Sequence, residues 1–382
     1  MSNFQTEEQF KNNLEKLMSE SSSQNSLYKP GNYWKFYEKN ILKQIKNNKL
    51  TEFRSWKGGS GKGNIQSFGG GTEIKCRKFM RNFHPIDDDF SFIDDSFLVR
   101  KYNSIINRII FFIPFFKFFL IRIAEIKSYY KDLYKSFVIE KYKSIIKEDK
   151  SLEKIYESDF GLNKKDCVFI NGKIYTIKLL QEMERLNFIK KNIELENINT
   201  ILEIGAGFGL LSSAFFKLKR NIKYLIIDIP PTICFAEYYL SNLAFKVFGY
   251  KELISKKEID IKKIFEDYDI ICLPPWKLNE VKDFSFDLFM NIQSFQEMEK
   301  DQTFNYLSIT KNNLVKNIYL ENSIEGHLKT KKKNEFGVIE KSNMNDIESY
   351  LSTSYNILQK DLTNQTNIEL KEKYRTLFKK KS

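Results

Sequence analysis

Three glycines spaced two residues apart, Gly205, Gly207 and Gly209, constrain this chain more than any other feature of its sequence. An apolar run at 201–204 comes directly before them, and apolar residues with helical spacing follow them. A strand that leads into a helix through such a turn is typical of folds in which helices connect parallel strands. Because glycines lack Cβ atoms, the backbone of the turn can approach a ligand closely. The pattern therefore predicts an α/β fold with a ligand site at this turn.

After about residue 150 the sequence alternates short apolar runs with amphipathic helical stretches, which indicates a parallel sheet covered by helices. A helical stripe ahead of the first strand consists of Leu179, Leu180, Met183 and Leu186. Further strands are expected at 222–227, 268–273, 286–291 and 317–321. The 382 residues leave room for a second unit. We therefore expect a Rossmann-like domain at 156–382 and a mostly helical N-terminal region at 1–155.

Two carboxylates flank the glycine turn in the sequence. Glu203 lies two residues before Gly205, and Asp228 ends the second expected strand, 23 residues after Gly205. Asp228 is placed to accept both ribose hydroxyls of a nucleoside, and a helix cap is its alternative role. A dinucleotide fingerprint needs glycine where the chain has Leu210, and a carboxylate at Glu203 would repel a pyrophosphate. Glu203 instead suits the ammonium group of S-adenosylmethionine, so this cofactor is expected rather than NAD.

Four segments, ILEIGAGFG, KYLIIDIPPT, FDLFMNIQSFQEM and IYLENS, resemble class I S-adenosylmethionine-dependent methyltransferases. More specifically, they resemble the sugar O-methyltransferases of bacterial surface-polysaccharide clusters, over about residues 160–325. The resemblance implies a sheet of seven strands whose last two are antiparallel, for which 356–362 and 373–379 are available. It also implies methylation of a sugar or glycan hydroxyl rather than of a nucleic acid.

The resemblance further implies roles for single residues. Glu203 would face the methionine part of the donor, the glycines would allow its close approach, and Asp228 would face its ribose. The residues expected to bind S-adenosylmethionine are Glu203, Gly205, Ala206, Gly207, Gly209, Asp228, Ile229, Asn291 and Gln293. No metal ion is expected, because no group of His or carboxylate residues with ligand spacing surrounds these positions.

The general base that removes the proton of the acceptor hydroxyl is expected after the strand at 286–291. Many small-molecule O-methyltransferases carry a catalytic His followed by an acid at this position, where this chain has Gln296 and Glu297. Glutamine cannot accept the proton. The expected catalytic residue is therefore Glu297 or His327, which follows the strand at 317–321.

Other functions of the same fold stay open at the level of the sequence. Residues 268–276 (YDIICLPPW) resemble the motif that amino-methylating nucleic-acid enzymes place beside a flipped base. Leu273 occupies the position of the polar residue that would bind the target amine, and the strand counts as the third rather than the fourth. The alternatives are a nucleic-acid methyltransferase, a methyltransferase of another small molecule, and an inactive partner-binding module.

The chain carries 62 Lys and Arg against 49 Asp and Glu, a formal net charge of +13. A basic balance favours nucleic-acid or membrane partners, but a bias towards Lys, Asn and Ile runs through the whole sequence and explains much of the charge. The cysteines Cys76, Cys167, Cys234 and Cys272 form no CxxC pair, which indicates thiols in a reducing compartment. The first residues lack the basic start and apolar run of a secretory signal, so a cytoplasmic location is expected.

The N-terminal region carries the weakest functional signal. Charged residues and Pro114 interrupt the apolar stretch at 105–124, whose longest unbroken run, 109–116, is short of the roughly 18–20 residues that cross a bilayer. We expect a buried helix pair or an oligomer face there, with peripheral membrane contact as the alternative. The glycine-rich stretch 54–72 lacks the spacing of a phosphate-binding loop and is expected to form a flexible loop or lid. The region as a whole is assigned to acceptor capping or to dimerisation, which would make the protein a homodimer.

Overall fold

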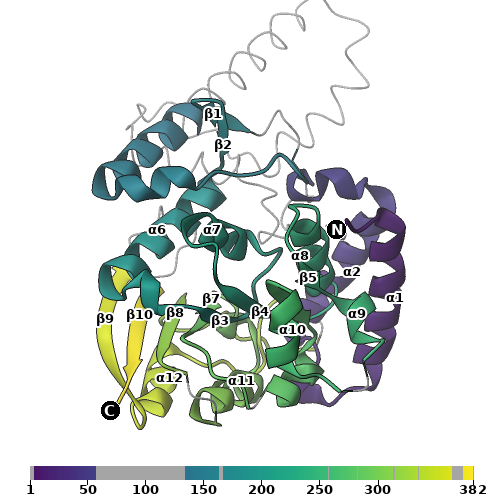
Figure 1. Cartoon of the computed structure of the whole chain (residues 1–382). Coiled ribbons are helices and arrows are strands. Elements are labelled where there is room, and N and C mark those ends of the chain that lie inside the picture. The colour runs from purple at the N-terminus through teal and green to yellow at the C-terminus, as the bar shows by residue number, and fades with distance from the viewer. Residues whose placement is uncertain are drawn as a thin grey trace, which may run out of the picture.

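The described residues form a mixed α/β fold on a sheet of eight strands in the order β5-β6-β4-β3-β7-β8-β10-β9 (Figure 1). The computed structural model describes residues 4–56, 134–162, 167–256, 258–281, 283–312, 315–333, 335–363 and 373–381. The first six strands in this order are parallel, and β10 is antiparallel to β8 and β9. Their bounds are β3 Thr200–Ile204, β4 Lys223–Ile227, β5 Val247–Phe248, β6 Ile270–Leu273, β7 Leu288–Ile292, β8 Asn317–Ser323, β9 Tyr355–Thr363 and β10 Lys373–Lys380.

Helices cover both faces of the sheet. One face carries α6 (Ile177–Asn192), α7 (Leu210–Leu218) and α8 (Thr232–Ser241), and the other carries α10 (Ile261–Asp267), α11 (Lys300–Asn312) and α12 (Met344–Leu351) (Figure 1). Smaller elements are the hairpin β1 (Val168–Ile170) and β2 (Lys173–Tyr175), and the short helix α9 (Tyr250–Leu253). The helical stripe predicted ahead of the first strand forms the buried face of α6.

The direction in which the chain adds strands reverses at the middle of the sheet. From β3 the chain passes through α7 to β4 and on towards the β5 edge, and later returns to β7 and passes through α11 to β8. Right-handed crossovers place the helices of these two halves on opposite faces. The carboxyl ends of the neighbouring strands β3 and β7 therefore form the topological switch point of the sheet.

The strands expected from the sequence are present, and so is the antiparallel placement of the last two. The predicted count of seven strands is wrong, because β5 adds an eighth. β5 consists of Val247 and Phe248, both buried, and a segment this short makes no recognisable apolar run. The strand that ends at Leu273 is therefore the fourth along the chain from β3, not the third. The argument that remains against the nucleic-acid motif is Leu273, which stands where that motif needs a polar residue.

The N-terminal helix α1 (Glu7–Ser23) packs against α8. It begins with a capping box, in which the hydroxyl of Thr6 accepts a hydrogen bond from Gln9 N at 3.2 Å and the side chain of Gln9 accepts one from Thr6 N at 2.9 Å. The buried face of α1 then contacts α8, with the ring centroids of Phe10 and Phe235 4.9 Å apart. The N-terminal region thus shares the hydrophobic core of the sheet domain.

A second N-terminal helix, α2 (Asn32–Asn47), reaches the segment that follows β8. The side-chain amide of Asn32 donates to the carbonyl oxygens of Glu335 and Gly337, each at 2.9 Å. The described N-terminal residues are mostly helical, as predicted, and a further helix covers residues 134–148. Cys76, the stretch 105–124 and most of 54–72 lie outside the described residues. In the described ranges, no helix is both long and apolar enough to cross a membrane.

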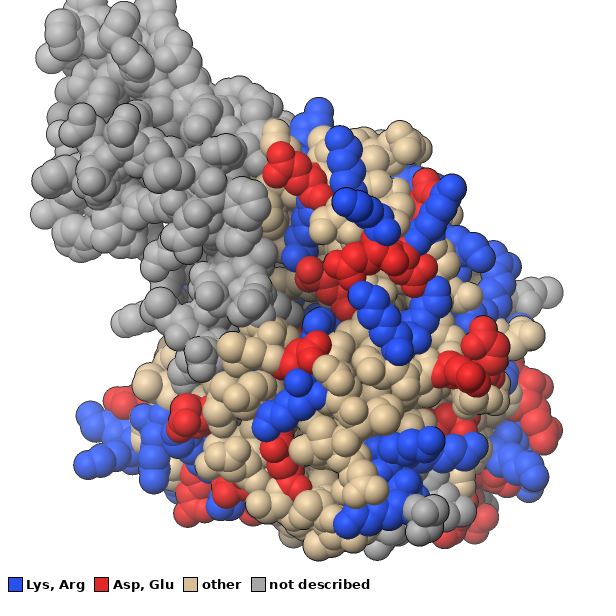
Figure 2. Space-filling view, turned by 90° about the vertical axis from the view of Figure 1, so that its left-hand side faces the viewer, with Lys and Arg blue, Asp and Glu red and all other residues tan. Residues whose placement is uncertain are grey.

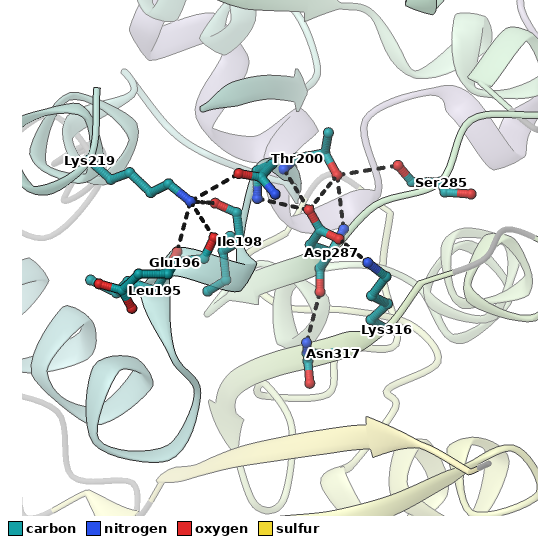
Figure 3. Close-up of polar contacts among 10 residues, drawn as sticks. Leu195, Glu196, Ile198, Thr200, Lys219, Ser285, Asp287, Lys316 and Asn317 are labelled. Atoms are coloured by element: carbon teal, nitrogen blue, oxygen red, sulfur yellow. Dashed lines mark hydrogen bonds and ion pairs between the residues drawn. The ribbon is translucent and has the colours of Figure 1, made fainter. Parts of the chain in front are cut away.

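A polar cluster at the amino edge of the sheet joins β3, β7 and β8 (Figure 3). The side chain of Asp287 accepts hydrogen bonds from Asn199 N at 2.8 Å, Thr200 N at 3.1 Å and Lys316 Nζ at 2.7 Å. Burial opposes the ionisation of Asp287, but these hydrogen bonds outweigh it and hold the pKa of Asp287 below its ordinary value. Beside it, Lys219 Nζ donates to three carbonyl oxygens of the segment before β3. The cluster fixes the starts of the strands whose other ends form the candidate site.

Replacing Asp287 by asparagine should lower the free energy of unfolding by about 1–3 kcal/mol, because an amide nitrogen would face donors that now meet a carboxylate. The pKa of Asp287 is lowered by folding, so its contribution is present above the ordinary carboxyl pKa and is lost as the pH falls below it. In urea unfolding, the deficit of the variant should therefore shrink between about pH 6 and pH 3. Asp283→Asn, at an exposed position before β7, is the control, with an expected change under about 0.5 kcal/mol. A deficit of equal size at every pH would refute this role of the Asp287 carboxylate.

Candidate functional site

The switch point brings together the segments that leave β3 and β7. In open α/β sheets, ligands bind outside the carboxyl ends of the strands at such a point. The glycine turn leaves β3 here, and Ser294 follows the end of β7. A Cβ atom built at Gly205 would lie 2.5 Å from Cβ of Ser294, so the two segments touch and only glycine fits at this position. The predicted turn therefore lies where the topology favours a ligand.

The backbone of the turn is left-handed at all three glycines, with φ of +77° at Gly205, +62° at Gly207 and +83° at Gly209. L-residues with a Cβ rarely adopt these angles. At Gly209 packing adds a second requirement, because a Cβ there would lie 2.7 Å from Cδ1 of Leu240 on α8. Ala206 is half-buried, and its carbonyl oxygen accepts a hydrogen bond from Gly209 N at 3.1 Å. The turn is thus a fixed backbone bend rather than a loose loop.

Asp228, directly after β4, supports the turn from the side. Its Oδ2 accepts a hydrogen bond from Gly207 N at 2.9 Å, and its Oδ1 accepts one from Ile229 N at 2.8 Å. Each carboxylate oxygen has a second lone pair, so Asp228 can accept further hydrogen bonds from a ligand. Burial raises the pKa of Asp228 to about 7, and the two backbone hydrogen bonds oppose that rise. The N-cap of α8 is Pro231, so the alternative role of Asp228 as that cap is not what its contacts indicate.

Glu203 lies on β3, two residues before the turn, with 2% of its surface exposed. Its Oε2 accepts a hydrogen bond from Tyr224 OH at 2.5 Å. Burial raises the pKa of Glu203 to about 8; the hydrogen bond from Tyr224 opposes the rise, and the charges of Glu182 and Asp228 add to it. The site therefore contains a carboxyl group that is neutral near pH 7 and would ionise beside a cation.

A buried ion network lies next to Glu203 and was not predicted. Arg185 of α6 donates from Nε and Nη2 to the two carboxylate oxygens of Glu321 at 2.9 and 2.6 Å, and from Nη1 to Glu182 at 2.8 Å. Tyr319 OH also donates to Glu321, at 2.9 Å. Burial opposes the ionisation of Glu321, but the charge and hydrogen bonds of Arg185 outweigh it and lower the pKa of Glu321 to about 2. The network fixes α6 against the carboxyl end of β8.

Asn291, predicted to bind the donor, is fully buried at the end of β7. Its amide nitrogen donates to Ile204 O at 3.0 Å and to Ser294 Oγ at 2.5 Å. Its Oδ1 accepts hydrogen bonds from Phe295 N at 3.1 Å and from Asn322 Nδ2 at 3.0 Å. Both N–H donors and both lone pairs of the amide are thus used inside the protein. These contacts give Asn291 the role of joining the ends of β3, β7 and β8.

Gln293 and Ile229, also predicted to bind the donor, are half-buried at the ends of β7 and β4. Gln293 has a left-handed backbone, with φ of +61°. Its N–H donates to the carbonyl oxygen of Glu321 at 2.7 Å, and its side chain donates to Oε1 of Glu321 at 3.2 Å. Strained backbone of this kind in a residue other than glycine clusters at functional sites. Through its two hydrogen bonds to Glu321, Gln293 connects the exit of β7 to the ion network.

The helix α2 brings the two base candidates to one aromatic cluster. His327 packs edge-on against Tyr33, at 4.6 Å between ring centroids, and against Phe336 at 5.1 Å. Tyr37 lies one helical turn from Tyr33, with ring centroids 5.0 Å apart. Burial raises the pKa of Tyr37, a hydrogen bond with Tyr33 opposes that rise, and the charge of Glu297 adds to it. His327 thus contacts α2, and the charge of Glu297 acts on the next turn of the same helix.

Gln296, whose amide cannot accept the proton of the acceptor hydroxyl, has a structural role. Its side-chain oxygen accepts a hydrogen bond from Ser323 N at 2.6 Å, and the residue is buried.

The spacing of Tyr33 and Tyr37 is visible in the sequence, but nothing there connects α2 with the ends of β7 and β8. In the part of the chain that the structure describes, no three His, Cys, Asp or Glu residues gather into a group that could hold a metal ion.

No protein-family model and no curated protein matches the chain. Solved structures match about half of it. The mitomycin 7-O-methyltransferase MmcR has 9% identity over 53% of this chain and 57% of its own, with a TM-score of 0.34. TrmK of M. capricolum with S-adenosyl-homocysteine has 16% identity over 52% and 68%, with a TM-score of 0.32. The N-methyltransferase NodS from Bradyrhizobium japonicum with S-adenosyl-L-homocysteine has 11% identity over 53% and 86%, with a TM-score of 0.33. At these identities and scores, the matches do not decide the family or the activity of this chain.

Proposed function

We propose that this chain is an S-adenosylmethionine-dependent methyltransferase that methylates a sugar hydroxyl in the synthesis of a surface polysaccharide or another glycan. One observation supports it most: the buried carboxylate of Asp228 is bound to the backbone of the glycine turn at 2.9 Å and retains lone pairs for a ligand. A glycine turn beside a carboxylate at the switch point of a parallel sheet suits a nucleoside. Leu210 and Glu203 disfavour a pyrophosphate there, and so favour this donor over NAD.

The residues at the switch point fit this donor. When bound, S-adenosylmethionine supplies a methyl group on a positively charged sulfur. Asp228 accepts the ribose hydroxyls, and the left-handed glycines let the nucleoside lie against bare backbone. Glu203, whose carboxyl is held neutral by burial, ionises when a cationic group lies beside it. These residues bind and orient the donor at the edge of the sheet.

The acceptor side of the site consists of α2 and the segments after β7 and β8. Tyrosine rings combine an apolar face with a hydroxyl, which suits a sugar ring with its C–H faces and hydroxyl groups. Tyr33 and Tyr37 present such rings beside the two base candidates. Orienting the acceptor oxygen and excluding water can supply roughly 7–11 kcal/mol of the barrier reduction. The N-terminal region then acts as the acceptor cap.

Glu297→Gln should lower turnover by about 10²- to 10⁴-fold, because the amide cannot take the proton of the acceptor hydroxyl. The affinity for S-adenosylhomocysteine should stay the same. The assay uses labelled S-adenosylmethionine with a panel of nucleotide sugars, and Glu325→Gln, at an exposed position after β8, is the control. His327→Asn tests the second candidate in the same way. Transfer to none of the sugars by the wild-type protein would refute the proposed acceptor, and a parallel loss of donor affinity in Glu297→Gln would refute a role as base alone.

Methylation of nucleic acid is the alternative function that charge alone would favour. Figure 2 shows the face that carries α6 and the β9–β10 hairpin, where basic and acidic side chains are interspersed. A protein that follows a phosphate backbone needs a continuous basic track, which this face does not offer. The affinity of a nucleic-acid enzyme for its acceptor would fall steeply with salt, whereas that of an enzyme for a neutral sugar would not.

The affinity for S-adenosylhomocysteine should rise with pH, by up to about tenfold per unit between pH 6 and pH 8. Burial raises the pKa of Glu203 to about 8, so the free site binds a proton that the ammonium group of the ligand expels. Because the folded protein binds this proton more tightly than the unfolded chain, the contribution of Glu203 to stability is present at low pH and is lost as the pH rises through about 8. Calorimetry in buffers of different ionisation enthalpy measures the proton release. An affinity independent of pH, with no proton released, would show that no cation binds beside Glu203.

A further inference from the structure

Glu182, on the buried face of α6, has a carboxylate oxygen that the proposed function leaves unexplained. The residue is 9% exposed, and its Oε1 accepts a hydrogen bond from Arg185 Nη1 at 2.8 Å. Its Oε2 is buried and has no hydrogen-bond partner in the described part of the chain. A buried carboxylate oxygen without a partner is costly and uncommon in folded proteins. This oxygen therefore points to a hydrogen-bond donor that the described residues do not supply, such as a ligand.

The surroundings of Glu182 place this oxygen at the switch point. The charge of Glu182 raises the pKa of Glu203 on β3 and that of Tyr224, which donates to Glu203. Glu203 in turn lies two residues before the first glycine of the turn. Two carboxyl groups from different elements, Glu182 on α6 and Glu203 on β3, thus influence each other electrostatically near the carboxyl end of β3.

The cations near Glu182 and Glu203 balance the negative charge of Glu182 only in part. Arg185 donates two of its hydrogen bonds to Glu321, at 2.9 and 2.6 Å, and a single one to Glu182. The charge of Lys373 also acts on Glu321, where it lowers the pKa. One guanidinium is thus shared by two carboxylates, and the charge of Lys373 acts on Glu321 as well. The position beside Glu182 and Glu203 consequently favours a cation.

We propose that Glu182 is a second carboxylate of the donor site and recognises the ammonium group of the donor's amino-acid part, together with Glu203. This inference rests on the function proposed above. An ammonium group fits better than a metal ion, because Arg185 occupies one side of Glu182 and the described residues form no metal-binding group here. An ammonium also supplies the N–H that Oε2 of Glu182 lacks. Glu182 is then a specificity residue that separates amino-acid-bearing nucleosides from those without an amino group.

Glu182→Gln should weaken the binding of S-adenosylhomocysteine by about 10- to 100-fold and leave that of 5′-methylthioadenosine, which lacks the amino-acid part, unchanged. Both affinities are measured by calorimetry at pH 7.5. Glutamine keeps the shape of the side chain and its acceptor for Arg185, so a thermal melt checks that the variant is folded. The matched control is Glu184→Gln, two residues along α6, which pairs with Lys141 at 2.7 Å away from the sheet. The control should bind both ligands as the wild-type protein does.

A comparison of two ligands on the wild-type protein tests the proposal without depending on how well the variant folds. The wild type should bind S-adenosylhomocysteine at least about tenfold more tightly than its analogue without the amino group, and Glu182→Gln should reduce this preference. Equal binding of the two ligands by the wild type, or equal losses for S-adenosylhomocysteine and 5′-methylthioadenosine in Glu182→Gln, would overturn the role of Glu182 while leaving the proposed donor in place. Binding of neither nucleoside by the wild type would overturn the proposed function and this inference together.

Discussion

Arg185→Met should lower the free energy of unfolding by about 3–5 kcal/mol, the largest loss of stability expected from a single substitution at this site. The side chain of Arg185 is 6% exposed, and its guanidinium pairs with Glu321 at 2.6 Å and with Glu182 at 2.8 Å. Methionine fills a similar volume but removes the cation, so Glu182 would lose its paired charge and Glu321 the two hydrogen bonds from the guanidinium. Urea unfolding at pH 7, followed by circular dichroism, measures the difference.

The control for this prediction lies on the same helix. Lys191 pairs with Glu148 at 2.7 Å near the end of α6, but both side chains are more than half exposed. Lys191→Met should therefore change stability by at most about 1 kcal/mol. If Arg185→Met were no more destabilising than Lys191→Met, the ion network would not be what fixes α6 against β8.

Gly205→Ala should reduce the affinity for S-adenosylhomocysteine by more than about 100-fold and destabilise the protein by about 2–3 kcal/mol. The residue has φ of +77°, and a Cβ atom there would collide with the side chain of Ser294. The turn would have to move away from the end of β7, which opens the switch point. Calorimetric titration gives the affinity, and urea unfolding gives the stability.

Two further variants separate the effect of backbone strain from that of the collision. Gly172→Ala, in the β1–β2 turn, has nearly the same φ, +75°, with no atom within 4 Å of the new Cβ. It should cost only the strain, about 1 kcal/mol, with donor affinity unchanged. Adding Ser294→Gly to Gly205→Ala removes the colliding atoms and should restore part of the affinity. A Gly205→Ala protein that binds S-adenosylhomocysteine normally would show that the turn is not part of the donor site.

The sheet could be predicted from the sequence because its signals are local. Buried parallel strands appear as apolar runs, and the glycines at 205, 207 and 209 identify a turn, in which the structure shows left-handed backbone angles. β5 was missed because two residues make no such run. The β1–β2 hairpin was missed although Asn171 and Gly172, with φ of +49° and +75°, form a typical two-residue hairpin turn.

The contacts of the candidate site could be predicted only in part. Asp228 was placed correctly at the glycine turn, because the end of the second parallel strand must lie beside that of the first. The pairing of Arg185 with Glu321 spans 136 residues, and no periodicity connects residues so far apart. The same holds for the contact of Tyr33 with His327, since it depends on where α2 docks. Local patterns thus identify the turn, and the fold alone shows what surrounds it.

Titration of the purified chain with S-adenosylhomocysteine, the demethylated form of the donor, in a calorimeter decides whether the glycine turn binds the nucleoside and amino-acid parts of the proposed donor. We expect saturable binding at about one site per chain, abolished by Gly205→Ala and weakened by Asp228→Asn, which removes an acceptor for the ribose hydroxyls. If the wild-type protein gives no saturable heat with S-adenosylhomocysteine or S-adenosylmethionine, or if both variants bind as the wild type does, the proposed donor site is wrong.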